Sequence, residues 1–330
     1  MTTQGEIFDI TIVGGGPTGL FGAFYAGLRG MSVKIIDSLE QLGGQLMALY
    51  PEKYIYDVAG FPKIYAKDLV EQLKEQAFQF PVTTCLGETV LNIGPRVDGV
   101  FTLETDKGKH YSRAIVITVG MGAFTPKKLD IEGLEAYEGK GVHYFVPKLS
   151  EFYNKRVLIV GGGDSAVDWA LALHDKADVT LIHRRDRFRA HEASVEQLMA
   201  SQAKVKTFYE LHEVHGEGHV EEAVIINNRT QETERLQVDE IILSLGFNPD
   251  VKLVRSWGLE MEDGGIVTNS KMETNIPGIY AAGDIAQYPG KIKLIACGFS
   301  EAAIAVNVAA TFINPDAKLF PGHSTSLKMS

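Results

Sequence analysis

The sequence predicts an α/β protein built from two Rossmann-like dinucleotide-binding domains. Three observations support this fold class: a glycine-rich loop follows an apolar strand, a helical pattern and a second strand follow that loop, and the whole arrangement occurs twice. The first unit covers residues 8–13, 19–30 and 32–37, and the second covers 156–160, 165–177 and 178–183. This internal repeat indicates two bound dinucleotides.

The composition restricts the class of protein. A chain of 330 residues with 45% hydrophobic residues can bury the cores of two domains. The only two cysteines, Cys85 and Cys297, lack metal-type spacing, which indicates a reducing compartment and excludes an iron–sulfur cluster. The net charge of −10 argues against nucleic-acid binding. With no leader-type segment and no apolar run approaching ~18 residues, we expect a cytoplasmic protein without a membrane or metal partner.

Further strands and turns connect the two units. Strands are expected at 102–105 and 110–119, followed by a turn-rich stretch at 120–128. After the second unit, strands at 223–227 and 240–245 lead to another turn-rich stretch at 246–249. A strand at 278–282 and a helix at 300–311 complete the pattern. The two turn-rich stretches mark the crossovers between the domains.

The first glycine loop has the full dinucleotide-binding context. Gly14, Gly16 and Gly19 form G-x-G-x-x-G directly after a strand and at the start of a helix. Such glycines let the backbone approach a pyrophosphate at the positive end of the helix dipole. Asp37 ends the next strand, where a carboxylate accepts hydrogen bonds from ribose hydroxyls and repels a 2′-phosphate. The first site therefore takes FAD or NAD.

The second glycine loop is followed by arginines instead of an acid. The loop reads G-x-G-x-x-A, and its next strand ends in His-Arg-Arg. Guanidinium groups bind phosphate through charge-assisted hydrogen bonds, so this site favours NADP over NAD. A solvated basic helix start is the alternative interpretation. The residues assigned to the NADP site are Gly161, Gly163, Asp164, Ser165, Ala166, Arg184, Arg185 and Arg189.

Four segments together resemble the thioredoxin-reductase-like flavoproteins: GGGPTG, GGGDSAVDWA, HRRDRFRA and YAAGDIA. The resemblance covers nearly the full chain. It implies three-layer ββα domains, with an NADPH-binding domain at 123–246 inserted into an FAD-binding domain at 1–122 and 247–330. It also implies that the tail at 320–330 lies over the flavin.

Missing thiols narrow the resemblance to one branch. Thioredoxin reductases carry C-x-x-C after a segment that is GKGVHY here, but the next four residues are Phe145, Val146, Pro147 and Lys148. Thr18 stands where bacillithiol-disulfide reductases have cysteine. The remaining resemblance is to ferredoxin/flavodoxin–NADP+ reductases. It implies hydride transfer between NADPH and FAD N5, one-electron transfer to or from ferredoxin or flavodoxin, and a homodimer.

The same resemblance suggests roles for individual residues. Tyr50 and His323 would stack on the two flavin faces, and no residue need act as an obligatory acid, base or nucleophile. On composition alone, Val90 and Phe124 could equally be core residues, Gln45 a turn cap and His323 a solvated end. The remaining residues implied to contact FAD are Thr18, Gln45, Val90, Phe124, Asp284 and Thr325.

Two other functions stay open from the sequence. One is an NADPH-dependent disulfide or peroxide reductase that lacks the C-x-x-C pair and uses Cys85 or Cys297. The other is a non-catalytic redox sensor with bound flavin. If the partner is an acidic ferredoxin, a local cationic surface must bind it. Candidate lysines for that surface are Lys127, Lys128, Lys291, Lys293 and Lys328.

Overall fold

The chain folds into two compact units in a computed structural model, which describes residues 5–146 and 148–326. The first unit comprises Met1–Ala48, Tyr54–Phe124 and Pro249–Ser330, and the second comprises Leu49–Lys53 and Thr125–Asn248. The expected domain boundaries lie two residues from these divisions. The short segment Leu49–Lys53 differs from the expectation, because it groups with the second unit.

A seven-stranded sheet forms the centre of the first unit. Its order is β5-β2-β1-β8-β7-β6, and β21 also pairs with β8. β8 pairs with three strands: its first residues pair antiparallel with β7, and its later ones pair parallel with β1 and β21. The strands are β1 (Ile7–Val13), β2 (Val33–Asp37), β5 (Val82–Leu86), β6 (Val90–Ile93), β7 (Phe101–Thr105), β8 (Lys109–Ile117) and β21 (Ile279–Ala281).

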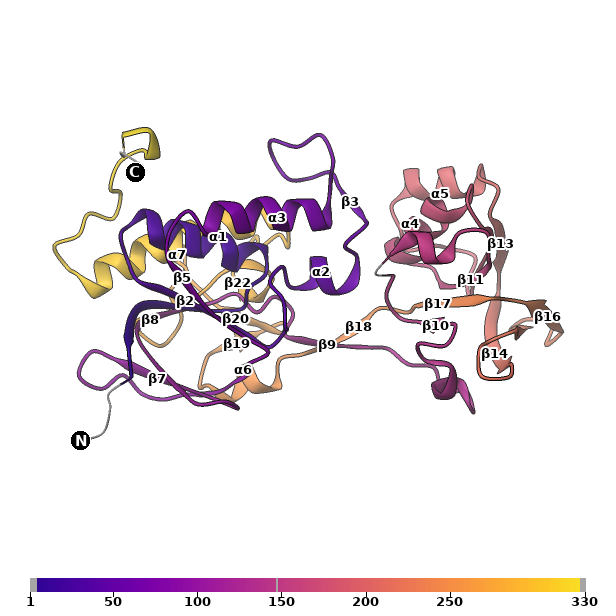
Figure 1. The fold of residues 1–330 in the computed structure, drawn as a ribbon, viewed down its shortest axis with the longest axis horizontal. Coiled ribbons are helices and arrows are strands. Elements are labelled where there is room, and N and C mark those ends of the chain that lie inside the picture. Colours follow the sequence, from indigo (N-terminus) through magenta and orange to yellow (C-terminus); the bar gives the residue numbers. More distant parts are fainter. Residues whose placement is uncertain (1–4, 147, 327–330) are drawn as a thin grey trace. The chain divides into compact units, whose positions relative to one another are not determined.

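Helices and an apolar cluster cover the two faces of this sheet. The helices α1 (Pro17–Leu28), α3 (Ala66–Ala77) and α7 (Ile295–Ile313) pack together along one side (Figure 1). On the other side, Ile36 and Ile117 are buried with Phe101 and Leu103 of the antiparallel strands. Smaller elements are α2 (Gln45–Leu49), β3 (Tyr54–Ile55), β4 (Ile64–Tyr65), α6 (Lys252–Ser256), β19 (Met261–Glu262), β20 (Gly265–Val267), η3 (Gly283–Ile285), β22 (Ala286–Gln287) and η4 (Ser324–Ser326).

The second unit repeats the parallel arrangement. Its sheet has the order β10-β17-β11-β12-β13, and every pairing in it is parallel. Both faces are buried, as expected for parallel strands of continuous apolar residues: Leu158 and Ile159 of β11 belong to opposite clusters. The elements of this sheet and its helices are η1 (Leu134–Tyr137), β10 (Val142–His143), η2 (Leu149–Phe152), β11 (Arg156–Gly161), α4 (Asp164–Leu173), β12 (Asp178–His183), α5 (Glu192–Met199), β13 (Lys204–Thr207) and β17 (Glu240–Ser244).

An antiparallel sheet and a pair of connecting strands complete the chain. The antiparallel sheet is formed by β14 (Tyr209–His215), β15 (Glu222–Asn227) and β16 (Thr233–Gln237). The two crossovers between the units are the strands β9 (Ala123–Pro126) and β18 (Phe247–Asp250), which pair with each other. Turns were expected at these places, so local glycine and proline content was overridden by the pairing of two chain segments.

Helix α7 differs most from its expected bounds. It begins at Ile295, five residues before the expected start at position 300, with Leu294 as its extended N-cap residue. By length and composition α7 could cross a membrane. In this fold Gly298, Ala302 and Ala305 are buried, and the helix packs against α1 and β8, so it serves as a core helix of the first unit.

Candidate functional site

The first glycine loop joins β1 to α1 and leaves no space for a Cβ at Gly14 or Gly19. Gly14 has a φ of +109°, which favours glycine, and Gly16 is the N-cap residue of α1. A Cβ added at Gly19 would lie 2.0 Å from the carbonyl oxygen of Gly14. The helix therefore starts in direct backbone contact with the loop, and its first N–H groups remain for an anion.

Asp37 is held against this loop by two backbone amides. It ends β2 and is 8% exposed. Its Oδ2 accepts a hydrogen bond from Gly15 N at 2.5 Å, and its Oδ1 accepts one from Leu39 N at 2.8 Å. Burial raises the pKa of Asp37, while these amide bonds oppose the rise. Each carboxylate oxygen keeps a further acceptor position, which suits ribose hydroxyls.

Other predicted residues gather around the same loop. The Thr18 side chain lies in the first turn of α1, 2.8 Å from where a Cβ on Gly283 would be, so the Gly283–Ile285 turn with Asp284 packs beside the loop. Gln45 begins α2, and its Nε2 lies 3.4 Å from a Cβ position at Gly120. Thr18, Gln45 and Asp284 are thus placed in one region of the first unit.

Val90 is a buried core residue, and the chain just before it contacts Asp37. It is a member of the apolar cluster that contains Ile36 and Phe101. Two residues earlier, Glu88 N donates to the carbonyl oxygen of Asp37 at 2.9 Å. This contact orders the connection from β5 to β6 beside the residue expected to bind ribose, and the adenine contact of Val90 stays a prediction.

The described structure does not test the flavin contacts of four other predicted FAD residues. The ring of Tyr50 packs against the apolar cluster of the second unit, with Lys53 Nζ 5.7 Å from the ring centroid. The side chain of Phe124 lies outside the described residues. His323 and Thr325 are exposed, and the His323 ring makes an edge contact with Phe320 at 5.2 Å. Their flavin contacts stay predictions.

The second glycine loop has the same construction with one open position. Gly161 ends β11, where a Cβ would lie 2.5 Å from the carbonyl oxygen of Ser244 and 2.9 Å from the Cβ of buried Ala166. Gly163 is the N-cap residue of α4, and a Cβ there would meet nothing within 4 Å. That open space beside a helix N-terminus fits a pyrophosphate. Asp164 Oδ1 accepts a hydrogen bond from the backbone N–H of His191, the N-cap residue of α5, at 3.0 Å, and Ser165 is exposed.

An arginine loop closes back onto the second glycine loop. Arg189 N donates to the carbonyl oxygen of Gly162 at 2.7 Å, which brings the segment after β12 next to the loop. Burial, and the nearby guanidiniums of Arg184, Arg185 and Arg189, lower the pKa of His183, which ends β12. Among the described residues, no carboxylate pairs with these exposed guanidiniums. Arg187 is also exposed. It was not assigned to the NADP site from the sequence, although the H-R-R-D-R-F-R run contains it.

The thiols do not form a reactive pair. Both cysteines are free. Burial, followed by the neighbouring Glu88 carboxylate, raises the pKa of Cys85, which disfavours the nucleophilic thiolate. The ligand atoms of Cys85, Glu88 and His110 lie within 4.8 Å of one another. His110 instead bonds Glu88 through Nε2 at 2.7 Å and Lys34 Nζ through Nδ1 at 3.1 Å, so these groups satisfy each other.

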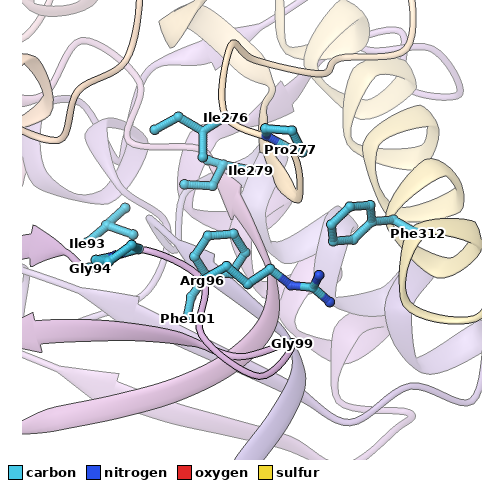
Figure 2. A pocket seen from close by; sticks show the side chains of 10 residues that line it. Ile93, Gly94, Arg96, Gly99, Phe101, Ile276, Pro277, Ile279 and Phe312 are labelled. Carbon is cyan, nitrogen blue, oxygen red and sulfur yellow. The ribbon is translucent and has the colours of Figure 1, made fainter.

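A cavity of about 550 Å³ lies apart from both glycine loops. Figure 2 shows its apolar wall, which includes Phe101 and Ile279, and the Arg96 side chain that extends toward Phe312. The guanidinium carbon of Arg96 is 4.6 Å from the centroid of the Phe312 ring. None of the predicted site residues lines this cavity.

The geometry defines an oxidoreductase with two dinucleotide sites. An acidic residue lies beside the glycine loop of one site, and arginines lie beside the loop of the other. The chain belongs to the pyridine nucleotide-disulphide oxidoreductase family, whose model matches residues 8–302. It is 57% identical to the ferredoxin–NADP reductase of Halalkalibacterium halodurans, over 99% of this chain and 100% of that one. It is 55% identical to ferredoxin–NADP reductase 2 of Bacillus cytotoxicus over the same shares of the two chains.

Solved structures agree with this family. The thioredoxin reductase of T. acidophilum matches with a TM-score of 0.78 and 26% identity, over 94% of this chain and 98% of that one. The thioredoxin reductase of Lactococcus lactis gives a TM-score of 0.78 and 28% identity, over 93% and 99%. The expected two-domain Rossmann-like fold is confirmed.

Gly19→Ala should abolish tight FAD binding, because the added Cβ would overlap the Gly14 carbonyl and move α1 away from the loop. We expect the FAD dissociation constant of the apoprotein to rise by at least about tenfold, given the ~1–3 kcal/mol typical of an overpacked site. Fluorescence titration measures it. The control is Gly163→Ala in the second loop, which should leave FAD affinity unchanged; equal losses in both variants would contradict the assignment.

The double variant Arg184→Ala, Arg185→Ala should weaken the binding of NADPH and not that of NADH. Loss of two charge-assisted contacts to a 2′-phosphate should raise KM for NADPH by about tenfold or more and leave KM for NADH nearly constant. Steady-state kinetics with both nucleotides measures the ratio. Arg235→Ala serves as the matched control, because Arg235 is an exposed arginine of the same unit and pairs with Glu222. Similar losses with NADPH and NADH would rule out 2′-phosphate recognition.

Proposed function

We propose that this chain is a ferredoxin–NADP+ reductase with FAD in the first unit and NADPH in the second. The observation that carries the proposal is the opposite ribose chemistry of two otherwise equivalent loops. Asp37, fixed by Gly15 and Leu39, suits free ribose hydroxyls, whereas Arg184 and Arg185 suit a 2′-phosphate. The 55–57% identical relatives that extend over the full chain carry the name of this activity.

The reaction balances without a protein nucleophile. NADPH and two oxidised ferredoxins give NADP+, a proton and two reduced ferredoxins. Bound FAD supplies the conversion between hydride transfer and one-electron transfer. The chain contributes binding and orientation: the Gly14–Gly19 loop and Asp37 hold one dinucleotide, and the Gly161–Ala166 loop with its arginines holds the other. This division of roles requires no catalytic triad.

Disulfide reduction is not favoured. None of the four residues after the segment 139–144 is a cysteine, and Thr18 occupies the first loop where a thiol would be needed. Burial and the neighbouring Glu88 carboxylate raise the pKa of Cys85, which disfavours a thiolate at that residue at neutral pH. A one-electron carrier protein is therefore the better acceptor, and we include flavodoxin with ferredoxin because both exchange single electrons.

The candidate docking lysines separate into two groups. Lys291 is buried in an ion pair with Glu301, so it is withdrawn as a docking residue. Lys128 pairs with Glu138 at 2.8 Å, which reduces the charge it can present. Lys127 and Lys293 are exposed and remain candidates for an acidic carrier, while Lys328 lies outside the described residues.

We further propose that the protein is a homodimer in which the tail contacts the second copy. Arg29 donates to the carbonyl oxygens of Lys318 and Leu319, which holds the start of the tail on the first unit. The next apolar side chains are exposed: Leu319 is 53% exposed and Phe320 is 60% exposed. Adjacent exposed apolar groups suit a partner surface, and a second copy of this chain would provide one.

The carrier assay tests the proposed reaction. Wild-type protein with NADPH should reduce cytochrome c only when ferredoxin or flavodoxin is present, because each carrier transfers single electrons. The Cys85→Ser, Cys297→Ser double variant should keep at least about half of the activity, since neither thiol takes part. The rate at 550 nm measures this. No stimulation by either carrier, or loss of activity in the double variant, would refute the proposal.

Replacing two tail residues tests the dimer. Leu319→Ser with Phe320→Ser should shift the protein from dimer to monomer in sedimentation-velocity experiments, because burial of two such side chains contributes ~1.5–3 kcal/mol each. Leu253→Ser is the control, since Leu253 is also exposed but lies on α6. A monomeric wild-type protein, or a dimer unchanged by the tail variant, would refute this proposal.

A further inference from the structure

Glu301 is a buried carboxylate that the proposed reaction does not use. It is 3% exposed and is the only charged residue in the sequence of α7. An ionised group inside a helix packed against the sheet is costly unless it is paired and hydrogen-bonded. Its partners therefore indicate what it does.

Three donors from one segment, residues 283–291, converge on this carboxylate. Gly283 N donates to Oε2 at 2.7 Å, and the Tyr288 hydroxyl donates to Oε1 at 2.6 Å. Lys291 Nζ also donates to Oε1, and its side chain is 3% exposed. Glu301 thus links both ends of this segment, which contains Asp284, to helix α7.

The turn at Gly283 has little freedom to satisfy its N–H in another way. Gly283 has a φ of +79°, and a Cβ there would lie 2.8 Å from Thr18 Oγ1. A Cβ at Gly298 would lie 2.3 Å from the same oxygen and 3.4 Å from Gly283 Cα. The turn is therefore packed between the first turns of α1 and α7. Without Glu301, its buried N–H would lose the acceptor it has in this structure.

We propose that Glu301 is a positioning residue that fixes the Gly283–Asp284 turn for FAD binding, with Lys291 as the cation that allows the carboxylate to be buried. This inference rests on the proposed function, which assigns FAD to the first unit. The hydrogen bond from Gly283 N sets the orientation of the peptide that precedes Asp284. A turn ordered before binding costs less when the dinucleotide binds than one ordered by the ligand.

The experiment separates the acceptor at position 301 from the buried charges. Lys291→Met is combined with either Glu301→Gln or Glu301→Leu, so both double variants lack the ion pair. Neutral replacement of a buried pair is often tolerated. Glutamine keeps a carbonyl oxygen for Gly283 N, whereas leucine has similar volume and no acceptor. Tyr288→Phe, which removes one donor and leaves the Gly283 bond, is the matched control.

FAD dissociation constants of the apoproteins are measured by fluorescence quenching, with thermal unfolding of each apoprotein measured alongside. We expect the FAD dissociation constants of K291M/E301Q and Y288F to lie within about threefold of the wild-type value. That of K291M/E301L should be at least about tenfold higher than that of K291M/E301Q, because a buried donor has lost its acceptor. Equal unfolding temperatures with unequal dissociation constants assign the effect to positioning. If the leucine variant is insoluble, K291M/E301I, which also lacks an acceptor and fills a similar volume, replaces it with the same expected order.

Equal FAD affinity of the glutamine and leucine variants would overturn the inference. So would a weaker affinity that is matched by an equal loss of apoprotein stability, because that result assigns Glu301 to folding alone. These outcomes are distinct from failure of the proposed function. If wild-type apoprotein binds FAD but no carrier stimulates turnover, the acceptor assignment fails while the ranking of the variants still decides the role of Glu301.

Discussion

The close approach of a helix to the strand before it is the constraint on which both units depend. At Gly19 of α1 an added Cβ would lie 2.0 Å from the carbonyl oxygen of Gly14, and at Gly161 of β11 it would lie 2.9 Å from the Cβ of Ala166 in α4. These contacts bring the first N–H groups of α1 and α4 to the carboxyl ends of their parallel strands. A diphosphate can be bound there by backbone groups alone, without a cationic side chain.

The two units differ where the second strand of each ends. In the first, the Asp37 carboxylate uses one lone pair on each oxygen to bind the loop and its own turn, so it is fixed before a ribose arrives. In the second, a run of arginines follows β12 and is tied to the loop only through the backbone of Arg189. One site thus presents fixed acceptors and the other presents exposed cations. Under the proposed function, this difference assigns FAD to the first unit and NADPH to the second.

Helix α7 supports the first site through two of its residues. It contributes Gly298 to the contact with Thr18, and Glu301 to the segment that carries Asp284. Ala302, Ala305 and Val306 of α7 are buried, and the side chains of the Lys291–Glu301 ion pair are only 3% and 4% exposed. The chain keeps the dinucleotide-binding fold of a family named for disulphides, but it lacks the vicinal thiols. The dinucleotide-binding fold therefore does not by itself determine the electron acceptor, which depends on the residues around the flavin.

The sequence by itself determined the two modules, their glycine loops and the acid-versus-arginine distinction, because all of these depend on residues close together in the chain. Strand β12 has its expected bounds, and β1, β2 and β11 differ by one residue at an end. Pairings between distant residues were decided only by the tertiary structure. Lys291 reads as a surface cation until α7 brings Glu301 to it, and Tyr50 reads as part of the first domain until its ring packs against the second unit. The early start of α7 has the same cause: packing against α1 and β8 stabilises helical turns that the local pattern does not mark.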